Sequence, residues 1–305
     1  MRIGFSIPNG GPMATPETIL NIAKRAEELE YHSLWTFERV LCAVDPRDPY
    51  PGTPDGSWPS VFRRMLDPLD TLTFVAGRTS RIALGTSVIN MPYYNPVMLA
   101  RRLTTIDYLS NGRLRVGLGL GWSKDEMEAT GADMKQRGAS ADEFLQVLRA
   151  VWTQNPVEFQ GEFFRVPKSY IDLKPVQKPA PPIYLAGFVP AALARVARLG
   201  DGWNPAGLPL EAMAGMFASI KQMAAAAGRD ASSLDMVVRA NLQIMEKPLG
   251  KERRIFAGTL DQIREDTAAC AQIGAHEVHF DPGFGPASST VEAWLSLMEK
   301  LRSFA

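Results

Sequence analysis

Short apolar runs alternate along the chain with longer segments in which apolar residues recur at helical spacing. The segments of helical period carry the apolar face of amphipathic helices. This alternation predicts a parallel sheet, and its repetition without a break in composition favours a closed (β/α)8 barrel over an open doubly wound sheet. The runs that read as strands buried on both faces are residues 2–8, 33–37, 81–89, 113–119, 182–187, 201–204, 235–242 and 276–281.

Helix boundaries are marked by N-cap residues, by prolines at the first helical position and by glycines at the end. They predict helices over 16–30, from Asn95-Pro96 to Asn111-Gly112, over 190–200, and from Thr259, whose spacing to Gln262 is that of a capping box, to Gly274.

The two longest connections between strands, after the second and the fourth, far exceed the roughly 30 residues that a βαβ unit needs. The insertion after the second strand contains 45–59, where Pro, Gly and Asp are too dense for regular structure. The insertion after the fourth strand holds an extra helix near 140–153 and a hairpin near 157–166. Because barrel enzymes place their chemistry at the carboxyl ends of the strands, we expect segments 39–65 and 122–140 to roof a pocket there. The whole chain, 1–305, is expected to form one domain.

Composition and charge exclude several classes of protein. The chain has 33 Lys and Arg against 33 Asp and Glu, and it shows no basic patch, so neither nucleic acid nor a membrane surface is an expected partner. The two cysteines, Cys42 and Cys270, lie far apart and outside any cluster with metal-ligand spacing. We therefore expect no disulfide framework, no metal site and a reducing, cytoplasmic location.

Two glycine-containing segments are candidate binding elements. The run from Gly117 to Trp122 lacks the last small residue of a dinucleotide fingerprint, because Trp122 stands there. Its glycines indicate either close approach of a flat ligand or tight packing within the barrel. The turn at Gly187, before the helix that starts at Pro190, exposes backbone N–H groups and could hold a phosphate or carboxylate. A turn of this kind is also simply a short way to join a strand to a helix.

Charged and imidazole side chains add weaker candidates. Glu38 and Arg39 end the second strand, where a charged pair is either functional or a solvated loop entry. His279, near the end of the eighth strand, is a weaker candidate, because a lone histidine is usually structural. The motifs of serine hydrolases and P-loop nucleotidases do not occur in the sequence. From the residues alone we expect a barrel with a roofed pocket and one candidate anion site.

Several motifs, in order along nearly the whole chain, resemble those of the luciferase-like monooxygenase superfamily, in particular its flavin- and deazaflavin-dependent oxidoreductases. The motifs that carry the resemblance are Ala26-Glu27-Glu28-Leu29 with Ser33-Leu34-Trp35, Arg81 to Val88, Asn95-Pro96-Val97, Leu109 to Arg113 leading into Gly117 to Trp122 with Glu126, and Gly200-Asp201-Gly202-Trp203.

The resemblance implies a (β/α)8 barrel that binds a flavin-type ring at its mouth. It places a non-proline cis peptide at Ser87-Val88, against the ring, and the phosphate of the cofactor at Gly187 and Phe188. The residues that would bind the remainder of the cofactor or face the substrate are Ser6, Thr86, Ser87, Val88, Gly119, Gly121 and Trp122.

The most similar subfamily uses the deazaflavin coenzyme F-420, whose C5 exchanges a hydride with a substrate carbon, and we expect this activity on a small organic substrate. An FMN-dependent monooxygenase supplied by a separate reductase is the main alternative, because the cofactor decides the reaction class. A flavin-binding barrel without turnover, and a phosphate-handling lyase or isomerase, are further alternatives. Relatives also often form homodimers.

One motif departs from the subfamily. Many relatives carry Asp-His at the end of the second strand, where this chain has Glu38-Arg39. Arg39 can hold an anion but is not a ready general acid. Proton transfer is therefore unassigned, with Glu38 and Glu126 as weak candidates for it, and we name Glu38 and Arg39 as the catalytic candidates.

Overall fold

The computed structural model describes residues 1–53, 55–283 and 290–304. Its main sheet consists of parallel strands in the order β3-β2-β1-β13-β10-β9-β8-β5-β4, and an additional pairing of β3 with β5 closes the sheet into a barrel. The closed (β/α)8 prediction is confirmed and the open sheet is excluded. The strands are β1 (Arg2–Ser6), β2 (Ser33–Thr36), β3 (Ala83–Thr86), β4 (Ile89–Asn90), β5 (Leu114–Gly119), β8 (Ile183–Leu185), β9 (Gly202–Trp203), β10 (Asp235–Asn241) and β13 (Glu277–Asp281).

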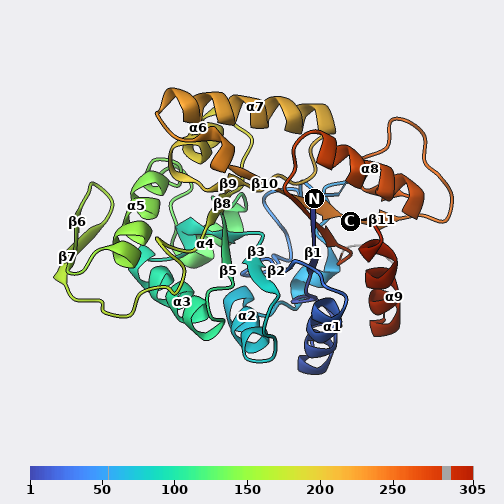
Figure 1. Cartoon of the computed structure of the whole chain (residues 1–305), viewed down its shortest axis with the longest axis horizontal. Coiled ribbons are helices and arrows are strands. Elements are labelled where there is room, and N and C mark those ends of the chain that lie inside the picture. The colour runs from blue at the N-terminus through green and yellow to red at the C-terminus, as the bar shows by residue number, and fades with distance from the viewer. Residues whose placement is uncertain (54, 284–289, 305) are drawn as a thin grey trace.

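Helices surround the strands, as Figure 1 shows. The expected N-caps are present: the Thr15 hydroxyl accepts a hydrogen bond from the Thr18 N–H, Asn95 caps the next predicted helix, and Thr259 forms the capping box with Gln262. The barrel helices are α1 (Pro16–Glu28), α2 (Pro68–Ala76), α3 (Pro96–Leu109), α5 (Ser140–Thr153), α6 (Pro190–Leu199), α7 (Leu210–Ala226), α8 (Leu260–Gln272) and α9 (Val291–Arg302).

The fourth β/α unit differs from expectation in one respect. Helix α5 packs between α3 and α6, so it is the regular barrel helix of this unit and not an added one. The added helix is α4 (Lys124–Thr130), which follows β5 directly. The predicted hairpin exists as the antiparallel pair β6 (Val157–Gln160) and β7 (Arg165–Ser169), follows α5 as expected and projects beyond that helix in Figure 1.

The remaining described elements are short. They are three 3-10 helices and a separate pair of parallel strands: η1 (Ser60–Arg63), η2 (Met91–Tyr93), η3 (Ala231–Ser233), β11 (Gln243–Ile244) and β12 (Ala257–Gly258). Residues 37–59, as far as they are described, contain no helix or strand, as the density of Pro, Gly and Asp predicts.

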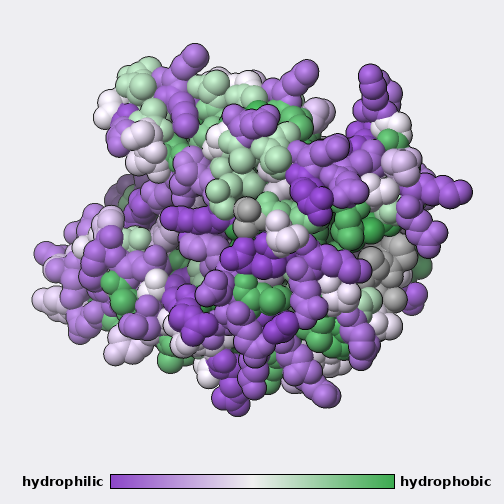
Figure 2. All heavy atoms as spheres, turned by 45° about the vertical axis from the view of Figure 1, so that its right-hand side comes forward, coloured by the Kyte–Doolittle hydropathy of each residue, from purple (hydrophilic) through white to green (hydrophobic). Residues whose placement is uncertain are grey.

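Hydrophilic residues cover much of the face shown in Figure 2, with hydrophobic residues scattered among them. In the part of the chain that the structure describes, every helix is too short or too polar to cross a membrane.

Glycine is required where strands approach each other most closely. A Cβ on Gly117 in β5 would lie 1.8 Å from the Thr86 carbonyl oxygen in β3, and a Cβ on Gly85 would lie 2.4 Å from the Trp35 ring. The Thr86 hydroxyl also donates to the Gly117 carbonyl at 2.8 Å and accepts from its N–H at 3.0 Å. The glycines of the Gly117 to Trp122 run indicated either close approach of a ligand or tight packing. For Gly117, tight packing is the explanation.

Substitution of Gly117 by Ala should destabilise the protein by about 2 to 4 kcal/mol, because the new methyl group would overlap backbone atoms that cannot move away independently. Gly138→Ala is the matched control, since a Cβ there meets nothing within 4 Å, and it should change stability by less than about 0.5 kcal/mol. Urea denaturation of both variants measures the difference. Equal stabilities would contradict this account of the barrel wall.

Candidate active site

A cavity of about 410 Å³ opens where the carboxyl ends of the strands meet the two roofing segments. We call it the mouth cavity. Its size lies within the range of cofactor and small-molecule sites. The described residues that line it are Phe37, Glu38, Arg39, Tyr50, Phe62, Ser87, Val88, Asn90, Gly119, Leu120, Gly121, Trp122, Arg137, Ala186, Gly187, Phe188, Val189, Ala192, Asn204, Ala206 and Arg239.

A buried ion pair joins the two roofing segments. The Arg39 guanidinium donates to the Glu126 carboxylate at 2.7 Å, and the same carboxylate accepts from the Val40 N–H at 2.7 Å. The side chain of Glu126 is fully buried and that of Arg39 is 11% exposed. The pair ties the segment that follows β2 to helix α4.

Aromatic rings pack around this ion pair. The Arg39 guanidinium lies 5.1 Å from the centre of the Trp122 ring and 5.5 Å from that of Phe62, within cation–π range. Tyr50 contacts both rings, with centroids 5.9 Å from Trp122 and 5.1 Å from Phe62. The predicted roof is therefore present, and its inner surface is aromatic and cationic.

Outside the cavity, exposed ion pairs reinforce the same junction. Lys124 lies 2.9 Å from Asp48, and Arg47 lies 2.6 Å from Asp125. Exposed pairs of this kind contribute little individually, about 0 to 1 kcal/mol.

Glu38 is a buried carboxyl group in the cavity wall, with 4% of its surface exposed. It accepts hydrogen bonds from the Asn90 N–H at 2.7 Å, from the Asn90 side-chain amide at 3.1 Å and from the Tyr94 hydroxyl. Burial disfavours the ionised form and raises the pKa of Glu38 to about 7, although these donors oppose the shift. A carboxyl group with this pKa can hold or release a proton near neutral pH.

Arg239 extends from β10 into the cavity. Its guanidinium pairs with Asp281 and donates to the carbonyl oxygen of Ser87. The Ser87 hydroxyl in turn donates to the Asn204 side-chain oxygen at 2.7 Å. Neither Arg239 nor Asn204 was expected from the sequence, because neither belongs to a recognisable motif.

One end of the cavity is suited to an anion. Gly187 has a φ of 138°, which favours glycine, and the Trp203 indole N–H donates to its carbonyl at 2.8 Å and holds the turn in place. Helix α6 starts just beyond this turn without a side-chain cap, and Phe188 and Val189 are exposed there. Free N–H groups at such a helix start, together with Arg137 in the same cavity, favour a bound phosphate or carboxylate.

The structure brings most of the sequence-predicted site residues into this cavity. Two cofactor-site candidates lie outside its lining: Thr86 is fully buried against Gly117, and Ser6 is 4% exposed within the barrel. The Ser87-Val88 peptide is cis, at the position that the resemblance implies. The predicted residues that line the cavity are Glu38, Arg39, Ser87, Val88, Gly119, Gly121, Trp122, Gly187 and Phe188.

Two weaker candidates, Glu126 and His279, do not line the cavity. Glu126 lies outside the lining and acts on the cavity through Arg39. His279 is fully buried below the cavity and stacks on Trp35, with ring centroids 4.7 Å apart. Burial, aided by the charge of Arg239, holds the pKa of His279 well below its ordinary value, so its imidazole stays neutral.

The charges of the cavity suit a flat anionic ligand. Three arginines line it, Arg39, Arg137 and Arg239, and Glu38 is the one carboxyl group among the described lining residues. Within the described chain, no group of three or more His, Cys, Asp and Glu side chains could hold a metal ion. The described residues thus combine an anion-binding end, an aromatic roof and a proton-holding carboxyl group.

A parallel (β/α)8 barrel with such a cavity at its carboxyl-terminal mouth has the architecture of a cofactor-dependent barrel enzyme. The model of the luciferase-like monooxygenase family matches residues 1–249, and the chain belongs to this family. It is accordingly an enzyme of the flavin- and deazaflavin-dependent oxidoreductase kind.

Individual relatives differ in activity. An uncharacterised protein of Mycobacterium tuberculosis is 31% identical over 255 residues, which are 81% of this chain and 89% of the relative. An F-420-dependent glucose-6-phosphate dehydrogenase of Amycolatopsis mediterranei is 28% identical over 233 residues, 74% of this chain and 65% of the relative. A solved monooxygenase structure from Streptomyces bottropensis shares the fold, with a TM-score of 0.81 at 23% identity over 100% of this chain and 98% of that one.

Replacing Glu126 by Gln should destabilise the protein by about 3 to 5 kcal/mol, because the Arg39 charge would stay buried without its counter-ion. Glu128→Gln on the same helix is the control. The Glu128 side chain is 75% exposed and pairs with Arg47 at the surface, so its loss should cost less than about 1 kcal/mol. Chemical denaturation compares the two, and equal losses would show that the buried pair does not hold the roof.

The raised pKa of Glu38 predicts a specific pH dependence of stability. Between its ordinary pKa of 4.5 and about 7 the folded protein binds more protons at Glu38 than the unfolded chain does, so the wild-type free energy of unfolding falls as pH rises. Glu38→Gln removes this dependence. Relative to wild type, the variant should therefore gain about 1 to 3 kcal/mol between pH 5 and pH 8, measured by urea denaturation. Parallel pH profiles of the two proteins would contradict the assignment.

Proposed function

We propose that the protein is a coenzyme F-420-dependent oxidoreductase, which exchanges a hydride between C5 of the deazaflavin and a carbon of a small organic substrate. The F-420-dependent glucose-6-phosphate dehydrogenase among its relatives supports the choice of cofactor. The single observation that carries the proposal is the buried Glu38 carboxyl group, with a pKa of about 7, in the wall of the same cavity as the anion-binding turn at Gly187.

The residues of the mouth cavity fit a phosphate-bearing flavin-type cofactor. The uncapped start of α6 and Arg137 would hold its phosphate, and the lack of a Cβ at Gly187 keeps the turn open, since a Cβ there would lie 2.7 Å from that of Ala192. Gly119 and Val88 also pack closely, because a Cβ on Gly119 would lie 2.7 Å from Val88. Val88 and Gly119 would therefore present a smooth surface to a ring.

In this reaction Glu38 would accept or donate the substrate's proton. When bound, the deazaflavin supplies a carbon that accepts or releases a hydride. If the substrate is an alcohol, its C–H bond loses the hydride, its O–H bond loses a proton, and the Glu38 carboxylate takes up that proton as the carbonyl forms. In the reduction of a carbonyl, the hydride and the proton move in the opposite direction, and the Glu38 carboxyl group donates the proton. Arg39, held by Glu126, keeps a positive charge beside the site.

A second candidate function is an FMN-dependent monooxygenase that receives reduced flavin from a separate reductase. The similarity in fold to the Streptomyces monooxygenase supports this alternative. The same cavity residues would bind FMN, because its phosphate would also bind to the N–H groups at the start of α6 and to Arg137. The separate reductase belongs only to this alternative. Assembly as a homodimer and a cytoplasmic location stay predictions from the sequence.

Side-by-side titration with coenzyme F-420 and FMN, followed by visible absorbance, tests the choice of cofactor. We expect binding of the deazaflavin and little response to FMN. Micromolar binding of FMN without a response to the deazaflavin would refute the proposal in favour of the monooxygenase.

Gly187→Val should weaken cofactor binding at least tenfold, because the side chain would crowd Ala192 and close the anion-binding turn. Gly215→Val, in a helix where a Cβ meets nothing within 4 Å, is the control for the effect of the valine itself. Arg137→Gln gives a second test that does not strain the backbone, and it should also lower affinity. Unchanged affinity in both site variants would place the phosphate elsewhere.

A further inference from the structure

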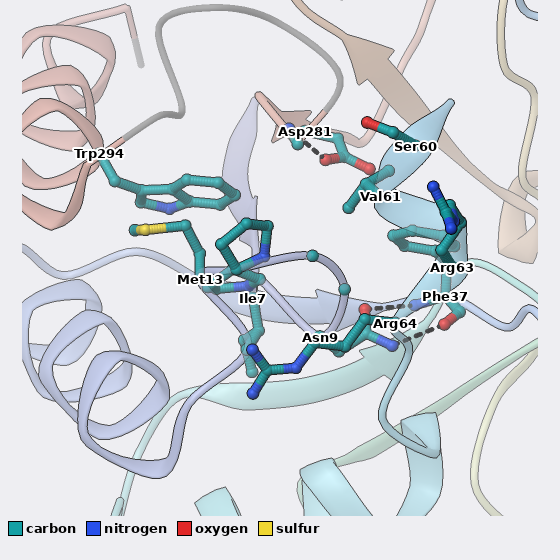
Figure 3. A pocket seen from close by; sticks show the side chains of 15 residues that line it. Ile7, Asn9, Met13, Phe37, Ser60, Val61, Arg63, Arg64, Asp281 and Trp294 are labelled. Carbon is teal, nitrogen blue, oxygen red and sulfur yellow. Dashed lines mark hydrogen bonds between the residues drawn. The ribbon is translucent and has the colours of Figure 1, made fainter. Parts of the chain in front are cut away.

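A second cavity, of about 530 Å³, lies beside the mouth cavity at the ends of β1 and β13. We call it the side cavity. Its walls come from the loop after β1, with Ile7 and Met13, from η1 with Val61, and from Trp294 at the start of α9. Figure 3 shows the Trp294 indole over Met13 at one end, with Val61 and Phe37 at the other.

The two cavities share a wall. Phe37 lines both, and Phe62, which lines the mouth cavity, belongs to the same 3-10 helix as Val61. The Phe37 and Phe62 rings pack edge to face at 6.1 Å. Asp281, which lines the side cavity, pairs with Arg239, which lines the mouth cavity. A ligand in the side cavity would therefore contact the groups that border the proposed cofactor site.

One polar atom at the side cavity lacks a partner. The indole nitrogen of Trp294 is buried, and no described residue accepts a hydrogen bond from its N–H. The residue as a whole is only 2% exposed. The indole lines the cavity, and in Figure 3 its nitrogen lies on the side that faces Met13. An unsatisfied buried donor costs about 1 to 3 kcal/mol, so a ligand acceptor that moves the Met13 side chain aside would gain by bonding to it.

The charge around the side cavity is positive. Arg63 and Arg64 line it from exposed positions, and neither forms an ion pair with any described residue. Asp281 is the one carboxylate among the described lining residues, and it is already compensated by Arg239 and by the Gly283 N–H at 3.0 Å. The remaining described lining side chains are mostly apolar. The site therefore favours a negative group at the arginines and an apolar body within.

We propose that the side cavity is a second ligand site, which takes a small organic anion with an apolar body and hydrogen-bonds one of its acceptors through Trp294. The occupant is identified by this chemistry alone, and the existence of the site does not depend on the proposed function.

Calorimetric titration of the cofactor-free full chain with 4-biphenylcarboxylate tests the site, with the neutral 4-biphenylmethanol as the matched probe. We expect the carboxylate to bind at least fivefold more tightly than the alcohol. Arg63→Gln combined with Arg64→Gln should abolish this preference. Trp294→Phe, which removes the N–H donor and leaves a smaller aromatic ring, should weaken both probes about three- to tenfold.

Ser60→Trp tests the location, because residue 60 lines the side cavity from an exposed position and a large ring there would obstruct it without disturbing the core. It should lower carboxylate affinity at least tenfold. Val44→Trp is the control, since Val44 is 95% exposed and lines neither cavity, and it should leave affinity unchanged.

Absence of carboxylate binding to the wild type, or equal binding to Ser60→Trp, would overturn the proposal. Cofactor titration of Ser60→Trp separates the two hypotheses. Loss of probe binding with retained cofactor affinity supports the side cavity, whereas a wild type that binds the probe but neither coenzyme F-420 nor FMN would refute the proposed function alone.

Discussion

The buried ion pair between Arg39 and Glu126 is the constraint on which the mouth of the barrel depends. Removing two charges from water is costly, and the cost is offset only where geometry and further hydrogen bonds satisfy both groups. The Val40 N–H and the Tyr93 hydroxyl supply such bonds to Glu126. The segment after β2 must therefore meet helix α4, and this meeting places Trp122 and Phe62 against the guanidinium. That contact therefore holds the aromatic roof over the cavity.

The same burial determines how the cavity can handle protons. Glu38 receives three hydrogen bonds that favour its ionised form, yet desolvation outweighs them, and the neighbouring charge of Glu126 acts in the same direction as desolvation. Arg39 is paired with Glu126 and Arg239 with Asp281, so neither neutralises Glu38 directly. One cavity thus combines strong cations for an anionic ligand with a carboxyl group that exchanges its proton near neutrality.

Local signals in the sequence were sufficient for much of the fold. The capping box at Thr259 and the N-cap at Asn95 act within four residues, and apolar runs identify strands whatever their partners. The prediction for the fourth unit is wrong about which helix is added, because a helix at 140–153 looks the same in sequence whether it is added or regular. Only its packing between α3 and α6 distinguishes the two. The third strand, read as one run, is divided into β3 and β4 around the cis peptide.

The candidate site was predictable where a strand end or a glycine-containing segment carried it, as at Glu38, Trp122 and Gly187, and unpredictable where long-range pairing created it. Arg239 is one arginine among many until β10 places it beside Ser87, 152 positions away in the chain.

By itself, then, the sequence determined the alternation of strands and helices, the parallel barrel and the family to which its motifs point, because hydrophobic period and helix caps are local properties. The tertiary structure alone decided which charges are buried together, which carboxyl group holds a proton, and that a second cavity shares a wall with the first. Burial and pairing depend on residues far apart in the chain, and no local pattern encodes them.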